Sequence, residues 1–121
     1  MPIFARVYTG EDGQSHLEEV TPEFQTFVDT EGAHGDATPM LPATGISTRR
    51  NEPGYFLDWH CAPRRQYVIT IAGEVEIGTA DGVRRFGPGT VLLAEDLTGK
   101  GHTTRVVGTE NRVSLVVPLA D

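Results

Sequence analysis

Two histidines, His60 and His102, stand in strand-like stretches of the second half of the 121-residue chain. An imidazole titrates near neutral pH, so either ring could accept or donate a proton during catalysis, and imidazole is also a common ligand of divalent metals. Asp58 lies two residues before His60, and residues two apart on a strand point to the same face. Asp58, His60 and His102 are therefore the candidate catalytic residues.

Each of these residues also has an ordinary structural interpretation. Asp58 stands in an apolar stretch, where a carboxylate is poorly solvated unless a cation pairs with it. Four arginines are near it in sequence and could form a salt bridge: Arg49, Arg50, Arg64 and Arg65. His60 and His102 could be hydrogen-bonded core residues without a chemical role.

The elements that must position these residues are short strands. Runs rich in β-branched and aromatic residues are separated by turn signals such as Pro53-Gly54 and Asp81-Gly82. They predict strands at Ile3–Tyr8, Ser15–Val20, Ile46–Arg50, Tyr55–Cys61, Gln66–Ile71, Glu74–Thr79, Val83–Phe86, Val91–Ala94, His102–Val107 and Arg112–Pro118. Val91–Ala94 is apolar throughout, which predicts burial on both faces. So many short strands at this spacing favour a double-sheet jelly roll.

The first third of the chain is richer in loops. Thr21-Pro22-Glu23 has the pattern of a helix start, a capping hydroxyl followed by proline, and apolar residues recur after it at helical spacing. We therefore expect a short helix near Pro22–Val28. Glycines and prolines punctuate Glu31–Gly45, which predicts a long loop.

Composition and charge exclude several functions. Seventeen acidic residues against ten basic ones give a net charge of −7, which disfavours binding to nucleic acid or to an anionic membrane. The single cysteine, Cys61, excludes an internal disulfide. The chain starts without a signal-peptide pattern, and no apolar run approaches the roughly 20 residues that cross a bilayer. We expect one cytoplasmic domain, in which residues 1–45 pack on a barrel core of residues 46–121.

The spacing of Gly54, His60, Ala62, Gln66 and Gly73 resembles the first motif of the cupin superfamily. That motif runs glycine, five residues, histidine, one residue, histidine, three or four residues, glutamate, six residues, glycine. The spacing is retained here, but Ala62 replaces the second histidine and Gln66 replaces the glutamate.

A second cupin-like motif starts at Gly89 and reaches His102. Glu95 and Leu97 stand where the family has proline and glycine. Four residues rather than two then lead to His102, and Val106 replaces the usual asparagine. The loop between these strands is therefore rebuilt and lengthened.

The resemblance covers about residues 46–118 and implies an all-β fold, the double-stranded β-helix or jelly-roll barrel of a small single-domain cupin. Small cupins commonly form homodimers through sheet faces and exchanged strands, so a homodimer is expected. The apolar face that carries Tyr55, Leu57 and Trp59 is consistent with such a partner.

The resemblance also implies a metal site inside the barrel. Its ligands would be His60, Gln66 and His102, and a divalent metal such as Fe, Zn, Ni, Mn or Cu would suit the two imidazoles. An amide oxygen is a weak neutral ligand, so charge compensation for the metal is reduced. Asp58 could replace the missing carboxylate.

Two functions follow from the resemblance. In the first, the chain is a small cupin enzyme that acts on an unidentified small organic molecule in the barrel pocket, as a dioxygenase, lyase, isomerase or cyclase. It would use a metal, or else His60 and His102 as acid and base. In the second, it is a non-catalytic small-molecule-binding cupin with an eroded metal site. The reason is that Ala62, Gln66 and Val106 lack the charge or the coordinating atoms of the residues usual at these positions.

Overall fold

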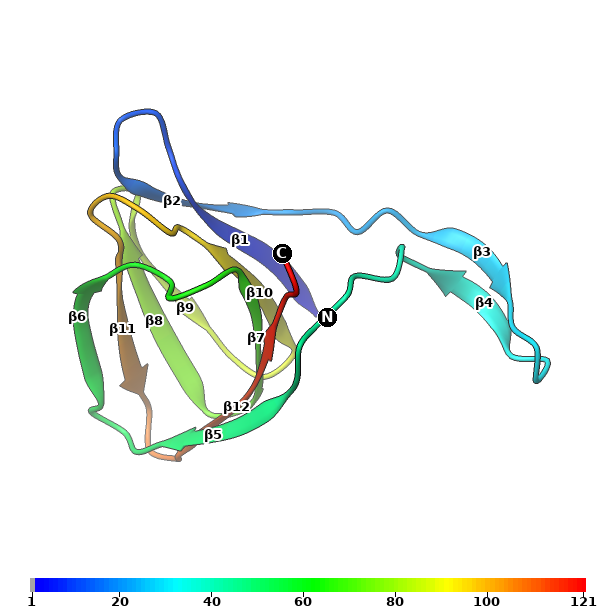
Figure 1. Ribbon diagram of the computed structural model, residues 1–121. Helices are drawn as coiled ribbons and strands as arrows, with labels where there is room; N and C mark the ends of the chain where they lie inside the picture. The colour runs from blue at the N-terminus through cyan, green and yellow to red at the C-terminus, as the bar shows by residue number, and fades with distance from the viewer. Residues whose placement is uncertain (1) are drawn as a thin grey trace.

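The computed structural model describes residues 2–121, which form twelve strands and no helix (Figure 1). The strands are β1 (Ile3–Thr9), β2 (Ser15–Glu19), β3 (Gln25–Val28), β4 (His34–Ala37), β5 (Ser47–Asn51), β6 (Phe56–His60), β7 (Gln66–Ala72), β8 (Glu74–Thr79), β9 (Gly82–Phe86), β10 (Thr90–Glu95), β11 (His102–Val107) and β12 (Arg112–Pro118). In this part of the chain no helix is long and apolar enough to cross a membrane.

Two facing sheets build the barrel. The six-stranded sheet has the order β2-β1-β10-β7-β12-β5, and the four-stranded sheet has the order β6-β11-β8-β9. Neighbouring strands are antiparallel except β1 and β10, which are parallel. The ten strands predicted from the sequence all form, with ends shifted by one residue at most. The predicted all-β jelly-roll barrel is confirmed.

The expected helix near Pro22–Val28 is wrong. Strand β3 occupies Gln25–Val28 and pairs with β4 in a separate two-stranded sheet. A turn joins them, in which the N–H of Asp29 donates to the carbonyl of Ala33 at 2.7 Å. Gly32 supplies the positive φ of 95° that this turn needs. β4 also interrupts the stretch Glu31–Gly45, which was expected to be a loop throughout.

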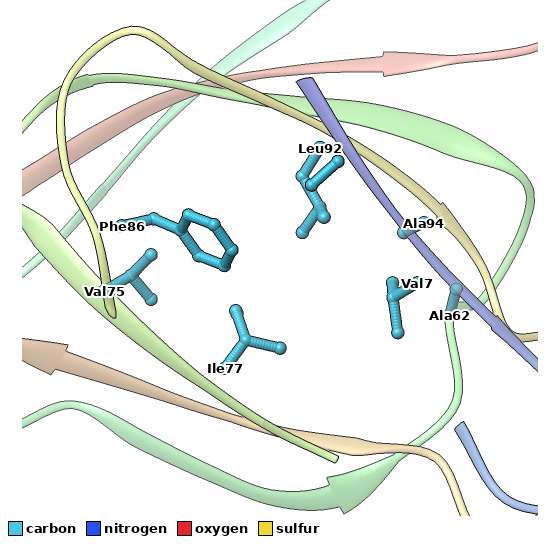
Figure 2. Close-up of a cluster of buried hydrophobic side chains, with 8 residues drawn as sticks. Val7, Ala62, Val75, Ile77, Phe86, Leu92 and Ala94 are labelled. Carbon is cyan, nitrogen blue, oxygen red and sulfur yellow. The ribbon is translucent and has the colours of Figure 1, made fainter. Parts of the chain in front are cut away.

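The apolar core lies between the two sheets (Figure 2). It consists of Ala5, Val7, Ala62, Val75, Ile77, Phe86, Leu92 and Ala94. Burial of a side chain such as Phe86 contributes roughly 1.5–3 kcal/mol to the free energy of unfolding. Along β10 only every second residue points inward, so Val91 and Leu93 stay half-buried on the outer face. The expected burial of Val91–Ala94 on both faces is therefore wrong.

The residues before position 46 contribute to the barrel wall as well as to the β3–β4 hairpin. β1 is hydrogen-bonded to β10 along six residue pairs, and Val7 is completely buried. β2 covers the outer edge of β1.

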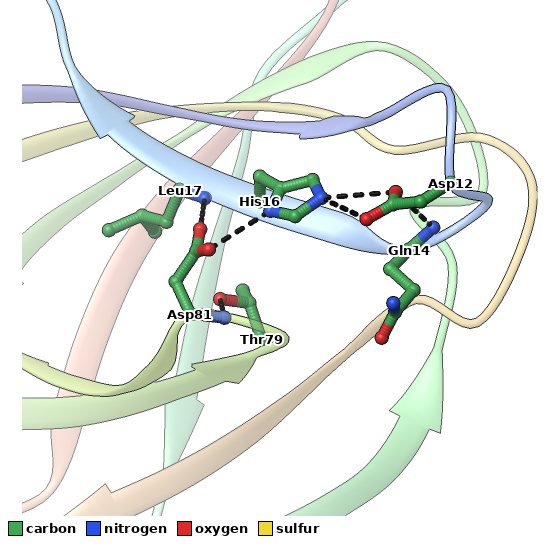
Figure 3. A network of polar contacts seen from close by, with 6 residues as sticks. All are labelled: Asp12, Gln14, His16, Leu17, Thr79 and Asp81. Atoms are coloured by element: carbon green, nitrogen blue, oxygen red, sulfur yellow. Dashed lines mark hydrogen bonds and ion pairs between the residues drawn. The ribbon is translucent and has the colours of Figure 1, made fainter.

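A polar clasp joins the β1–β2 turn to the β8–β9 turn (Figure 3). His16 lies between two carboxylates, with Nδ1 3.0 Å from Oδ1 of Asp81 and Nε2 2.9 Å from Oδ2 of Asp12. Asp81 also accepts the N–H of Leu17 at 3.1 Å. The hydrogen bonds to Asp81 and Asp12 raise the pKa of His16, because they favour the imidazolium.

The clasp should make the stability of the protein depend on pH. Since the pKa of His16 rises above 6.5 on folding, its contribution is fully present below pH 6.5 and is lost as the pH rises through the raised pKa. We expect the melting temperature of the wild type to approach that of His16→Ala as the pH rises above 6.5. Thermal unfolding between about pH 5 and about pH 9 measures the difference, with Gln14→Ala as the control. A difference that stays constant with pH would contradict this role.

Candidate functional site

A cavity of about 220 Å³ lies inside the barrel, with walls from both sheets. Its polar lining includes both predicted histidines and Gln66. Two arginines, Arg49 of β5 and Arg112 of β12, line the same space. Apolar side chains such as Val68, Ile77 and Leu92 complete the walls.

His60 stands at the end of β6 and is half-buried. Its Nδ1 lies 2.7 Å from the backbone carbonyl of Asp58. A carbonyl can only accept, so Nδ1 carries the proton and Nε2 is left with a free lone pair. Burial lowers the pKa of His60, and this effect outweighs the hydrogen bond to Asp58 that favours the charged form. The ring is therefore neutral at neutral pH.

His102, at the start of β11, is held by a buried carboxylate. Its Nδ1 lies 2.6 Å from Oδ2 of Asp96, which is 0% exposed. The same oxygen accepts the hydroxyl of Ser15 at 2.6 Å. The pairing fixes the orientation of the ring and leaves Nε2 as its free nitrogen. The centroids of the His60 and His102 rings are 4.3 Å apart.

Gly101 allows the two histidines to come this close. His102 and His60 are register partners of the β6–β11 ladder. A Cβ atom at Gly101 would overlap the backbone carbonyl of His60, and the residue has a φ of 81°. Only glycine tolerates both conditions. The lengthened loop before β11 therefore has a defined conformation where it meets β6.

The structure brings His60, Gln66 and His102 to the cavity but leaves Asp58 outside. Asp58 is exposed, and its Oδ1 accepts the N–H of Trp59 at 2.9 Å. The reason is a register shift in the β6–β11 ladder, where His102 pairs with His60 but Thr104 pairs with Leu57. The extra β6 residue reverses the alternation. Leu57 therefore lines the cavity together with His60, and Asp58 points away.

Asp96 is the residue whose role the sequence interpretation missed. It lies between Glu95 and Leu97 of the second motif and was not among the candidate catalytic or metal-binding residues. The signal was present in β10, because Leu92 and Ala94 alternate inward and Asp96 continues the same period. Arg49 and Arg112 were not singled out for the cavity either.

The donor set does not fit the divalent metal that the resemblance implies. The free Nε2 atoms suit metal binding in their orientation, but Gln66 is neutral and its Oε1 accepts from Arg64 at 3.3 Å. Among residues 2–121, no group of three or more His, Cys, Asp or Glu side chains is placed to hold a metal. The described lining contains no carboxylate, whereas Arg49 and Arg112 both face the cavity. A dication would meet two guanidiniums without an anionic ligand.

Comparisons with known proteins assign no family to the chain. No family model and no curated protein matches it. One similar solved structure is the capsular polysaccharide assembling protein CapF from Staphylococcus aureus, with 14% identity, a TM-score of 0.44, and coverage of 82% of this chain and 31% of that chain. A structure of CapF with the inhibitor 3-isopropenyl-tropolone gives 14% identity, a TM-score of 0.43 and the same coverage. This chain thus spans about a third of the length of CapF.

Asp96→Asn should disturb both the fold and the orientation of His102. Oδ1 of Asp96 is buried without a hydrogen-bond partner, so the new amide would leave a buried donor unsatisfied or turn it toward Ser15 and His102. We expect the free energy of unfolding in urea to fall by about 1–3 kcal/mol. Nitrogen NMR of the rings should show that His102 loses its preference for a protonated Nδ1. Glu95→Gln, on the outer face, is the control for the ring signals, and an unchanged His102 tautomer in Asp96→Asn would contradict the assignment.

Proposed function

We propose that this protein is a cupin-like barrel that binds a small organic molecule in its cavity and transfers a proton on it without a bound metal. The observation that carries the proposal is the pair of imidazoles in one cavity, each with Nδ1 engaged and Nε2 free. Imidazoles at this spacing can both reach one small substrate, and general acid–base catalysis requires that reach.

The two imidazoles suit different tasks. His102 is suited to take the proton, because the Asp96 carboxylate behind it compensates the positive charge that forms on the ring. His60 is held neutral by burial, so its Nε2 can accept a hydrogen bond that orients a substrate hydroxyl or amine. When His102 removes a proton from one atom of the substrate and returns it to another, the reaction is an isomerisation, which is within the range that the cupin resemblance implies.

The geometry at the motif positions supports a relation to the cupins. His60, Ala62 and Gln66 all line the cavity, as the metal-ligand positions of that family do. The flanking motif glycines have positive φ angles, 91° at Gly54 and 76° at Gly73. The spacing of the motif is thus retained together with its structural use, although the ligands themselves are replaced.

A non-catalytic ligand-binding barrel is the second candidate. Two of the motif positions favour it, because their side chains are not available to a substrate. Ala62 is buried in the core cluster, and the side-chain amide of Gln66 is hydrogen-bonded to Arg64. Such a protein would use the same cavity, and His60 and His102 would only hydrogen-bond the ligand.

Metal content tests the first half of the proposal. Elemental analysis of native protein purified without chelator should find less than stoichiometric metal, unchanged in the double variant His60→Ala/His102→Ala. The reason is the cationic lining, which offers no anionic ligand to a dication. A stoichiometric metal that is lost in the double variant would contradict the proposal.

Ligand binding and proton exchange test the second half. A panel of neutral, cationic and anionic small molecules, screened by ligand-detected NMR, should contain members that bind the wild type. Leu57→Trp fills the cavity and should abolish their binding, whereas Phe56→Trp is the matched control, because Phe56 is equally exposed but does not line the cavity.

Proton exchange then separates the two candidate functions. Bound panel members should exchange a carbon-bound proton in D₂O with the wild type but not with His102→Gln. Binding without exchange would leave the non-catalytic alternative. A panel in which no member binds would overturn both.

A further inference from the structure

Arg112 places a buried positive charge at the cavity without a counter-ion. The residue is 8% exposed, and its Nε and Nη2 both donate to the hydroxyl of Thr70, at 3.3 and 3.0 Å. Among residues 2–121 no carboxylate lies within ion-pair distance of the guanidinium, and Nη1 has no acceptor. A buried charge is normally paired, because the loss of hydration is otherwise uncompensated.

A second guanidinium adds to this charge. Arg49 of β5 lines the same cavity, and its register partner on β12 is Ser114, two residues from Arg112. Burial and the positive charge of Arg49 lower the pKa of Arg112 to about 10, so Arg112 is still charged at neutral pH. The hydroxyl of Ser114 and the amide of Asn51 supply further hydrogen-bond groups to the same wall.

We infer that Arg112 and Arg49 bind the carboxylate of a small organic acid, whose apolar body extends along the cavity toward His60 and His102. The inference rests on the proposed function and adds the chemical class of the ligand. A planar guanidinium matches a carboxylate in a two-point contact, and an anion would compensate the buried charge of Arg112.

The rest of the lining favours an organic acid over inorganic phosphate. Val68, Leu92 and Val116 give the cavity apolar walls, and its volume of about 220 Å³ is below the roughly 300–1,000 Å³ of most ligand pockets. A compact molecule with one charged end and an apolar body satisfies both regions. Phosphate would leave the apolar wall without a partner.

Benzoate and benzamide form a matched pair of probes, because they have nearly the same shape and differ in charge. We expect benzoate to bind the wild type saturably by NMR titration and benzamide to bind at least about tenfold more weakly, as for a charged against a neutral hydrogen-bonded partner. Arg112→Met should lose this preference. Without ligand, its melting temperature should equal or exceed that of the wild type, because an unpaired buried charge has been removed.

Arg49→Gln is the second variant, in case Arg112→Met fails to fold. Arg49 is exposed, so its replacement leaves the core intact, and benzoate binding should weaken several-fold. If benzamide binds as tightly as benzoate, or phosphate binds more tightly, the carboxylate inference is overturned while the proposed binding cavity stands. If neither benzoate nor benzamide binds but neutral or cationic members of the panel do, the carboxylate inference is likewise overturned and the proposed binding cavity stands. If no molecule binds at all, the proposed function falls with it.

Discussion

The buried carboxylate of Asp96 holds together the parts of the molecule on which the site depends. One of its oxygens accepts from Ser15 of β2 and from His102 of β11, and its backbone carbonyl accepts the N–H of Ala62 at 3.0 Å. Asp96 itself directly follows β10. A buried charge is tolerated only with such partners. Through its carboxylate and its backbone carbonyl, Asp96 ties β2, β11 and the segment at Ala62 to the end of β10. The same bonds orient the imidazole that faces the cavity, which makes the stability of this end of the barrel and the geometry of the site inseparable.

Charge distinguishes this cavity from the metal site that its motif spacing suggests. The motif position of the carboxylate ligand is Gln66, and Ala62 takes the place of one histidine. The cavity gains cations instead, with Arg112 buried and Arg49 beside it. Two guanidiniums and two imidazoles disfavour a dication and favour an anion. The replacements at the motif positions are therefore consistent with the proposal that the cavity holds an organic anion rather than a metal.

The strand pattern could be predicted almost completely, because β-branched runs and glycine turns act locally. The prediction of a helix near Pro22–Val28 was wrong, because helical spacing of apolar residues is informative only when a helix has a core to pack against. Within residues 2–121, the hairpin that contains β3 has no such core to pack against. The prediction that Asp58 shares a face with His60 was wrong for a different reason. A two-residue period holds only along a regular strand, and the β6–β11 ladder contains a register shift.

By itself, the sequence determined where the strands run and where the glycine turns fall, and it made His60 and His102 candidate catalytic residues. These are properties of short stretches of chain, set by local sterics and by the alternation of side chains. Only the tertiary structure decided which side chains meet in the cavity. The burial of Asp96, the approach of Arg112 to Arg49 and the exclusion of Asp58 depend on how distant strands pair, and on desolvation that arises only when the two sheets close.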